Sequence, residues 1–317
     1  MRAIWQPRGR TLLLFACACY VLAALLLPRL WSPADGGILR RLEAGESGCH
    51  SRLTMWSNVA QLISLRPWTG WGELAYAHMD MLYDGPRFCE IMGNAHNLPL
   101  HLAVTLGLPV AVLVCGAISW LIWRGKPWAE RDATRQMAWS VLVVIGLHSM
   151  LEYPLWYGPF QLAVVLAVWI LWRTRSPAAT EQCTQVRPWQ WGIVVISTLA
   201  LSYTALDYWR ISQIYLPVSQ RAAAYKDNTL EKLQGSVLFK DWVRFAELST
   251  TPITSQNAQH MNALAKDMLH FSPEAMVVEK VIDSARLLGD DEAVRYYSVR
   301  YQAAYPDAFA AWSKTAN

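Results

Sequence analysis

The apolar run from Leu98 to Trp123 constrains the fold of this 317-residue chain more than any other stretch. It is long enough to cross the hydrocarbon core of a bilayer as one helix. It follows directly on a polar segment that ends in His96 and Asn97. Asn97 is a suitable N-cap, and Pro99 fits the first helical turn. The pattern therefore predicts a membrane helix with a histidine at its mouth.

The composition also favours a membrane protein. Hydrophobic residues make up 54% of the chain and charged residues only 16%, which is too apolar for an ordinary soluble domain. The 17 Trp and 13 Tyr suit the aromatic belts of membrane interfaces. The net charge of +4 is small and no Lys/Arg-rich run is present, so nucleic acid is not expected as a partner. Cys49 and Cys89 lie in one polar loop, where they form either a disulfide or two unpaired thiols.

The apolar segments together predict an all-α, polytopic membrane bundle of about five spans. Three basic residues precede the first segment, as in a signal peptide, but no small-x-small cleavage site follows it, so a retained helix is predicted. The third segment is shorter than the ~20 residues that a span usually needs, so it and the fourth form either two crossings or a re-entrant pair. The five segments are 11–27, 98–123, 136–151, 154–172 and 191–208.

The charge of the connecting segments predicts the orientation. The N-terminus and the loops at 124–135 and 173–190 contain ten Lys/Arg and three acidic residues, whereas the 29–97 loop contains six Arg and seven acidic residues. Basic loops remain in the cytoplasm, so we expect a multi-pass protein of a bacterial inner membrane with a cytoplasmic N-terminus. The predicted parts are the N-terminus with the first membrane helix at 1–30, a periplasmic loop at 31–97, membrane helices two to five at 98–209, and a periplasmic helical domain at 210–317.

Two regions outside the spans have helical periodicity. Residues 52–65 place apolar side chains on one helix face but are too short to span, so this helix is expected to lie flat on the membrane or to pack against the bundle. Residues 272–305 predict two helices separated by Gly289, the first capped by Ser272, which resemble a tetratricopeptide hairpin. The expected apolar face of the first region consists of Leu53, Trp56, Val59, Ala60 and Ile63.

His96 is the first candidate for chemistry. It is either a polar residue at the end of a membrane helix or a general base, and Asn97 frees it for the second role because Asn97 can provide the cap. The positive end of the helix dipole disfavours imidazolium and attracts anions such as phosphate. A neutral base beside an anion site suits attack by a hydroxyl group on a phosphate-linked donor. His101, about one turn further on, is a second choice and is otherwise a packed interior histidine.

Other polar residues are candidates for binding or support. Arg52 and Arg66 flank the short helix, and although surface arginines are usually only solvated, two guanidinium groups here are suited to hold a diphosphate. His148 and Glu152 are four residues apart on one face of the third predicted span and form either a structural pair or part of a catalytic site. The sequence contains no metal-ligand set, nucleophile elbow or phosphate loop, so neither a metal nor another cofactor is expected.

Several motifs resemble those of one enzyme superfamily. His96-Asn97, followed after nine residues by Gly107, resembles the His-Asn…Gly signature of the O-antigen ligase and Wzy-type polymerase superfamily. The chain is most similar to bacterial protein O-oligosaccharyltransferases of the pilin-glycosylase type, and it resembles only their C-terminal half. The other matching stretches are 51–56, 67–72, 94–98 and 148–155.

This resemblance implies a metal-independent, inverting transferase. Such enzymes move a preassembled oligosaccharide from undecaprenyl diphosphate to an acceptor hydroxyl group. By the resemblance, His96 would be the essential periplasmic histidine and Arg52 the arginine that binds the lipid diphosphate. The acceptor would be a protein such as a pilin-like protein, and either a missing N-terminal half or a partner chain would complete the lipid groove.

Two alternatives remain at this point. The same chemistry would serve an O-antigen ligase that uses lipid A core, or a polymerase that extends a growing glycan. In a different class, the chain would be a non-catalytic, membrane-anchored scaffold whose helical domain recruits periplasmic partners.

Overall fold

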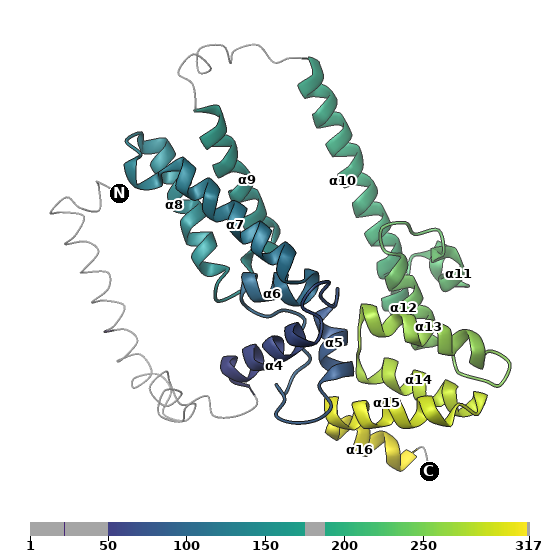
Figure 1. Cartoon of the computed structure of the whole chain (residues 1–317). Coiled ribbons are helices and arrows are strands. Elements are labelled where there is room, and N and C mark those ends of the chain that lie inside the picture. The colour runs from purple at the N-terminus through teal and green to yellow at the C-terminus, as the bar shows by residue number, and fades with distance from the viewer. Residues whose placement is uncertain (1–21, 23–49, 175–187, 316–317) are drawn as a thin grey trace. The chain divides into compact units, whose positions relative to one another are not determined.

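The computed structural model describes residues 22, 50–174 and 188–315, and every regular element in these parts is helical (Figure 1). Of the described residues, 50–72 and 86–174 form a first compact unit, and 73–85 and 188–315 form a second. The second unit therefore includes a short insert that comes from the middle of the first. The predicted all-α class is confirmed for this part of the chain.

The described part of the first unit contains five α-helices, and short connections join α6 to α9 in sequence. Helices α8 and α9 pack side by side, and the short helix α4 packs against α6 (Figure 1). Two 3-10 turns complete the unit, at Pro127–Ala129 and Pro154–Trp156. The helices are α4 (Arg52–Leu65), α6 (Leu98–Leu106), α7 (Leu108–Gly125), α8 (Ala133–His148) and α9 (Gly158–Arg173).

The predicted single helix over 98–123 is wrong, because the chain breaks at Gly107 into α6 and α7. Gly107 has a φ of 86°. In a continuous helix the amide of Leu108 would donate to the carbonyl of Val104. Here both groups bond to the 67–72 segment instead: Leu108 N donates to Pro67 O at 2.8 Å, and Val104 O accepts from Trp71 N at 2.9 Å. The break is thus a docking site for a segment that precedes it in the chain.

Gly107→Ala is expected to destabilise the first unit strongly. Gly107 has φ 86° and ψ 161°, a region that essentially only glycine occupies, and strain of this kind costs about 1–3 kcal/mol. A Cβ would also lie 2.4 Å from the carbonyl oxygen of Trp68. Gly116→Ala is the matched control, since a Cβ there meets nothing within 4 Å. Thermal unfolding in detergent measures both, and an unchanged melting temperature for Gly107→Ala would contradict this packing.

Two stretches of the described chain are helical, long and apolar enough to cross a membrane, Leu108–Ala129 and Trp191–Tyr215. Helices α8 and α9 have 16 residues each, which is about 24 Å of helix against a hydrocarbon core of about 30 Å. The first predicted span, 11–27, lies outside the described residues apart from Leu22. The topology of five spans therefore stays a prediction.

Helix α4 has the predicted bounds, but its buried face differs from the predicted one. The buried residues are Met55, Asn58, Val59 and Leu62, whereas Leu53 is 77% exposed. The difference arises at Asn58, whose side chain accepts from Phe88 N at 2.8 Å and donates to Pro86 O at 3.0 Å. Because Asn58 bonds to backbone groups of the 86–88 loop, it lies on the buried side of α4. The buried face is therefore centred on a different side of the helix from the predicted one.

The second unit contains a stack of antiparallel helices, in which α13 packs on α14 and α14 on α15 (Figure 1). The sequence of the first predicted helix has an apolar stripe, of which Val277, Val278, Val281 and Ile282 are fully buried in α14, whereas Leu287 and Leu288 at its end are 50% and 47% exposed. That helix begins after Glu274 rather than at Pro273, and the Ser272 hydroxyl donates to the Glu274 carboxylate at 2.7 Å instead of capping the helix. The helices are α5 (Leu74–Met81), α10 (Pro188–Tyr215), α11 (Thr229–Leu233), α12 (Lys240–Thr250), α13 (Ala258–Phe271), α14 (Ala275–Leu288), α15 (Asp291–Ala304) and α16 (Pro306–Thr315).

A buried ion pair attaches the insert 73–85 to the C-terminal helices. Helix α5 packs against α13 and α15. Arg300 Nε donates to the Asp80 carboxylate at 2.9 Å and to the Asp80 carbonyl at 2.8 Å, and the Tyr296 hydroxyl donates to the same carboxylate at 2.8 Å. The side chains of Asp80 and Arg300 are only 3% and 10% exposed, so this pair is part of the core of the second unit.

Candidate active site

Glu152 connects His96 and Arg52 in the first unit. Its Oε2 lies 2.9 Å from His96 Nδ1, and its Oε1 accepts a hydrogen bond from the Arg52 guanidinium. A second N–H of Arg52 donates to the carbonyl oxygen of Leu151. Glu152 is 56 residues from His96 and 100 residues from Arg52 in the sequence. The fold thus brings together three predicted site residues from three separate segments.

The position of His96 is held by its backbone and by its ring. The residue has a φ of 49°, which is uncommon for a residue other than glycine. Its amide donates to Asn94 Oδ1 at 2.9 Å, and the preceding carbonyl, of Ala95, accepts from the Trp56 indole at 3.0 Å. The imidazole packs edge-on against Tyr153, with ring centroids 4.9 Å apart. These contacts fix the direction in which the imidazole points.

The start of α6 is tied to the turn that carries Glu152. The Asn97 side chain donates to Met150 O at 3.0 Å, and Leu98 N donates to Ser149 O at 2.8 Å. Together with the contact between His96 and Glu152, these bonds join three consecutive residues, 96–98, to the turn 149–152. The 148–155 stretch therefore positions the His-Asn segment directly.

The predicted anion site on the backbone amides of this helix end is not available. Asn97 caps α6 as predicted, and its Oδ1 accepts from Leu100 N at 3.1 Å. Leu98 N donates to Ser149 O, and His101 N donates to Asn97 O at 2.8 Å. The remaining residue of the first turn is a proline, which has no N–H. The backbone N–H groups at this helix start therefore already have partners and are not free to bind an anion.

The carboxyl group of Glu152 is ionised in this arrangement. Burial opposes its charge, but the hydrogen bonds and charges of Arg52 and His96 outweigh burial and lower the pKa of Glu152. The interaction therefore contributes stability above the ordinary carboxyl range and is lost as the pH falls through the lowered pKa. When the imidazole is neutral, the carboxylate accepts its Nδ1–H, and Nε2 is then the nitrogen without a proton. An imidazole held in this way has the geometry that a general base requires.

Arg66 is not brought to this site. It is the C-cap of α4, whereas Arg52 is the first residue of the same helix, and 14 residues of helix span about 21 Å. The Arg66 guanidinium lies over the Trp71 ring, 4.0 Å from the ring centroid. The two arginines are too far apart to hold one diphosphate together, and Arg66 stabilises the 67–72 segment instead.

His101 and His148 make ring contacts away from Glu152. The His101 ring packs edge-on against Trp156 at 4.9 Å, and its buried Nδ1 has no hydrogen-bond partner among the described residues. The exposed His148 packs against Phe160 at 5.7 Å. Although Glu152 N still donates to His148 O at 2.8 Å, the Glu152 carboxylate bonds to His96 and Arg52, so the predicted pair between the His148 and Glu152 side chains is not formed.

Several groups at the site were not identified from the sequence. They are the Leu151 carbonyl beside Arg52, the Tyr153 ring beside His96 and the Trp56 indole that holds the His96 loop. Trp56 was interpreted as part of an apolar face. The available signal was Glu152 itself, the single charged residue in the 151–158 turn.

Cys89, in the loop before His96, is disulfide-bonded, and its predicted partner Cys49 lies outside the described residues. The loop that carries the His-Asn segment is thus held by a disulfide at Cys89.

Across the ranges 50–174 and 188–315, no cluster of three or more His, Cys, Asp or Glu side chains suits a metal ion.

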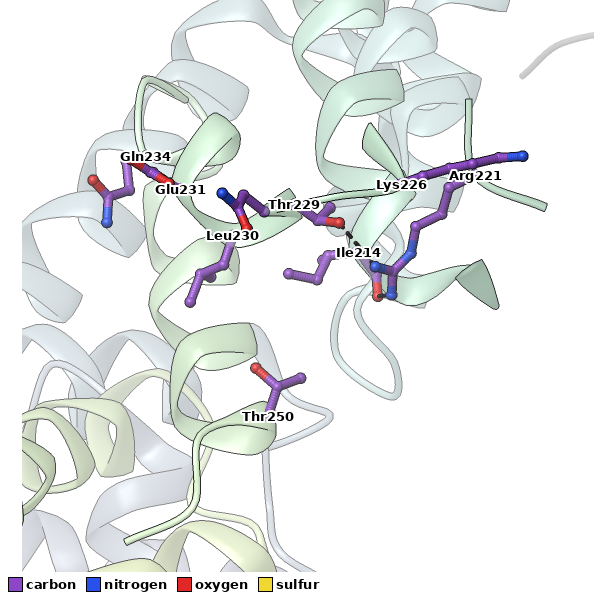
Figure 2. Close-up of a pocket in the computed structure, with 9 residues that line it drawn as sticks. Ile214, Arg221, Lys226, Thr229, Leu230, Glu231, Gln234 and Thr250 are labelled. Atoms are coloured by element: carbon purple, nitrogen blue, oxygen red, sulfur yellow. Dashed lines mark hydrogen bonds between the residues drawn. The ribbon is translucent and has the colours of Figure 1, made fainter. Parts of the chain in front are cut away.

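A cavity of about 500 Å³ lies in the second unit, where α10 ends (Figure 2). Arg221 lies beside it and donates to Leu216 O at 2.9 Å, to Ile214 O at 3.2 Å and to the Thr229 hydroxyl at 2.8 Å. Its charge therefore satisfies carbonyl groups at a helix C-terminus. The described residues that line the cavity include none of the predicted site residues, so it is separate from the candidate active site.

Comparison with known proteins agrees with the motifs. The model of the family described as virulence factor membrane-bound polymerase, C-terminal, matches residues 136–317, and that of the O-antigen ligase family matches residues 1–115. The chain is 25% identical over 194 residues to a general O-oligosaccharyltransferase of Acinetobacter baylyi. This match covers 58% of the chain and 32% of the relative, so the chain spans about a third of the relative's length. No solved structure matches the chain.

The two family matches, over residues 136–317 and 1–115, place the chain among membrane-bound polymerases and O-antigen ligases, and its two membrane-length helices agree with a membrane-bound family. One of these models covers more than half of the sequence. The chain belongs to the family of membrane-bound polymerases and O-antigen ligases, as the spacing from His96-Asn97 to Gly107 predicted.

Proposed function

We propose that this protein transfers an oligosaccharide from undecaprenyl diphosphate to a hydroxyl group of a periplasmic protein, at the outer face of a bacterial inner membrane. The observation that carries the proposal is Glu152, which joins His96 to Arg52. The relative from Acinetobacter baylyi, named as a general O-oligosaccharyltransferase, supports a protein as the acceptor.

In the proposed reaction, His96 Nε2 takes the proton of the acceptor hydroxyl group as its oxygen attacks the anomeric carbon of the donor sugar. The bond from that carbon to the diphosphate oxygen breaks, and undecaprenyl diphosphate leaves from the opposite face, so the configuration is inverted. Glu152 keeps the Nδ1–H of the imidazole directed toward itself and stabilises the imidazolium that forms. The proton then leaves His96 to solvent.

Arg52 is proposed to stabilise the leaving diphosphate. A guanidinium group has five N–H donors, and Arg52 uses two of them, for Leu151 O and Glu152. The others are available for phosphate oxygens. One guanidinium does not neutralise a diphosphate, and Arg66 is at the far end of α4, so we expect a second cation from residues outside the described part or from a partner chain. Positive side chains take the role of a metal ion in this proposal, and a chelator should leave the transfer rate unchanged.

Glu152→Gln is expected to lower kcat for transfer by about 10- to 100-fold, because a hydrogen bond to a charged group contributes about 1.5–3 kcal/mol. Glu130→Gln is the matched control, since Glu130 forms an ion pair with Arg135 at 2.5 Å in the same unit and lies away from His96. The measurement is the rate of transfer from a lipid-linked oligosaccharide to a pilin-like protein in detergent. Equal rates for the two variants would contradict a role for Glu152 in positioning His96.

The two matching families favour a second acceptor class, because they are described as O-antigen ligases and membrane-bound polymerases. Parallel assays with a pilin-like protein, lipid A core and a lipid-linked glycan as acceptors distinguish the three. The non-catalytic scaffold is tested by donor binding: purified protein that does not bind the lipid-linked oligosaccharide would support the scaffold.

A further inference from the structure

Helix α10 is longer than a bilayer requires. It has 28 residues, which is about 42 Å of helix, whereas the hydrocarbon core is about 30 Å thick. The excess is about 12 Å, which corresponds to the eight residues after Asp207, up to the helix end at Tyr215. We infer that the helix leaves the hydrocarbon region close to Asp207.

Contacts of Asp207 agree with this boundary. Its side chain is fully buried, but it is covered by the second unit: the carboxylate accepts from the Ser236 hydroxyl at 2.9 Å and from Leu238 N at 3.1 Å. Ser236 in turn accepts from Phe239 N at 3.3 Å. A buried carboxylate at membrane depth is costly unless it is paired. Here the turn 236–239 supplies hydrogen bonds to Oδ2, and the Arg210 guanidinium lies 3.7 Å from Oδ1.

The C-terminal part of α10 is also a core element of the second unit. Ile211 is 4% exposed and packs in one cluster with Leu233 of α11 and Val243 of α12. Arg210 donates to Lys232 O at 3.3 Å. The turn 236–239 is therefore held rigidly at the height of Asp207, about 12 Å along the helix from Tyr215 in the direction of the membrane.

The turn 236–239 carries two exposed apolar side chains at this height. Val237 is 67% exposed and Leu238 is 51% exposed. Tyr208, which follows Asp207 on α10, is 62% exposed, and its ring contacts Phe239 with centroids 5.9 Å apart. The apolar tip is therefore continuous with the apolar surface of a helix that is long enough to span, and an aromatic side chain of the type found in interfacial belts lies between them.

Positive charge lies next to the apolar tip. Arg210 is one turn beyond Asp207 on α10, and Lys240 is the first residue of α12, directly after the turn. The 210–244 segment contains six Lys/Arg and three acidic residues. Exposed apolar side chains flanked by cations are typical of segments that bind the surface of a bilayer containing anionic lipid.

We propose that the turn 236–239 is a membrane-docking element. Val237 and Leu238 insert at the boundary between headgroups and acyl chains beside α10, and Lys240 binds lipid phosphate groups, whereas Arg210 is ion-paired with Asp207. The occupant of this surface is the phospholipid bilayer that α10 crosses. The contact does not depend on the transfer chemistry, and it would hold the second unit at a defined height and tilt on the membrane.

Photo-crosslinking from single positions tests this proposal. Benzoylphenylalanine is introduced at Leu238, at Val195 in the middle of α10, and at Leu287 on α14, in otherwise unchanged protein. Leu287 is the matched control because it is 50% exposed, almost equal to Leu238. The protein is placed in nanodiscs of phosphatidylethanolamine and phosphatidylglycerol, irradiated, and analysed by intact mass for phospholipid adducts.

We expect phospholipid adducts at positions 238 and 195 and essentially none at 287. Lys240→Glu should lower the ratio of phosphatidylglycerol to phosphatidylethanolamine adducts at 238, and an unchanged ratio would overturn the role of Lys240. Adducts at 238 no more frequent than at 287 would overturn the docking element. Crosslinks from position 238 mainly to protein would also overturn it, because they would indicate a partner interface. The absence of a lipid adduct at position 195 would overturn it as well, since α10 would then not cross the bilayer.

Discussion

His96→Asn is expected to abolish oligosaccharide transfer while the protein remains folded. Loss of a general base lowers the rate by about 100- to 10,000-fold. Asn is a better replacement than Ala here, because His96 has a φ of 49° and Asn is among the residues that tolerate this left-handed conformation. The amide side chain of Asn cannot take up a proton at neutral pH, so it removes the proposed chemistry with little backbone strain.

The matched control for His96→Asn is His260→Asn. His260 also contacts a carboxylate, with Nε2 2.7 Å from Glu247 Oε1, but it is a 64% exposed side chain of the second unit. Transfer rates, binding of the lipid-linked donor and thermal unfolding are measured for both variants. We expect only His96→Asn to lose transfer, with donor binding and melting temperature close to those of the unchanged protein. Transfer at a near-normal rate by His96→Asn would show that another group is the base.

The residues of the site were predictable where local chemistry decides their place. Asn97 caps α6 because a short amide side chain before an apolar helical run satisfies a free backbone N–H, and this signal is contained within a few residues. Gly107 was tied to His96 by a resemblance, and the structure supplies its physical reason: the Trp68 carbonyl would lie 2.4 Å from a Cβ at that position.

The pairing of Glu152 with His96 and Arg52 was not predictable in the same way. The three residues are separated by 56 and 100 positions, and no periodicity determines which distant segments meet. Four-residue spacing instead favoured a pair of Glu152 with His148, which assumes that the helix continues. The regular helix ends at His148, and although one more backbone bond joins Glu152 N to His148 O, the Glu152 carboxylate turns toward the other two segments.

Hydropathy also concealed the break between α6 and α7. The run is apolar throughout, so a sliding average shows one span, although Gly107 and Pro109 are both residues that interrupt helices. The break becomes favourable only because the 67–72 segment pairs with the backbone groups that it exposes. A long-range partner also explains the buried face of α4. Asn58 is buried there because its side chain bonds to the loop at 86–88.

Asp80→Ala is expected to destabilise the second unit by about 3–5 kcal/mol, because removing one partner of a buried ion pair leaves an uncompensated charge. Asp80 is buried by α13 and α15, and its carboxylate accepts from both Arg300 and Tyr296. Arg244→Ala is the matched control: its ion pair with Asp267 has a similar length of 2.6 Å, but the two side chains are 39% and 65% exposed. For such a surface pair we expect a loss of about 1 kcal/mol or less.

These differences in the free energy of unfolding are measured by chemical unfolding in detergent, with limited proteolysis of the second unit as the signal for unfolding. The double variant Asp80→Leu, Arg300→Met distinguishes the cause. If the destabilisation arises from the charge left unpaired, the double variant should be more stable than Asp80→Leu alone, since no buried charge remains. If it were less stable than either single variant, the pair would act mainly through packing of α5 on α15. We expect the first result, because the Arg300 guanidinium is 10% exposed and has no other carboxylate within 4.0 Å among the described residues.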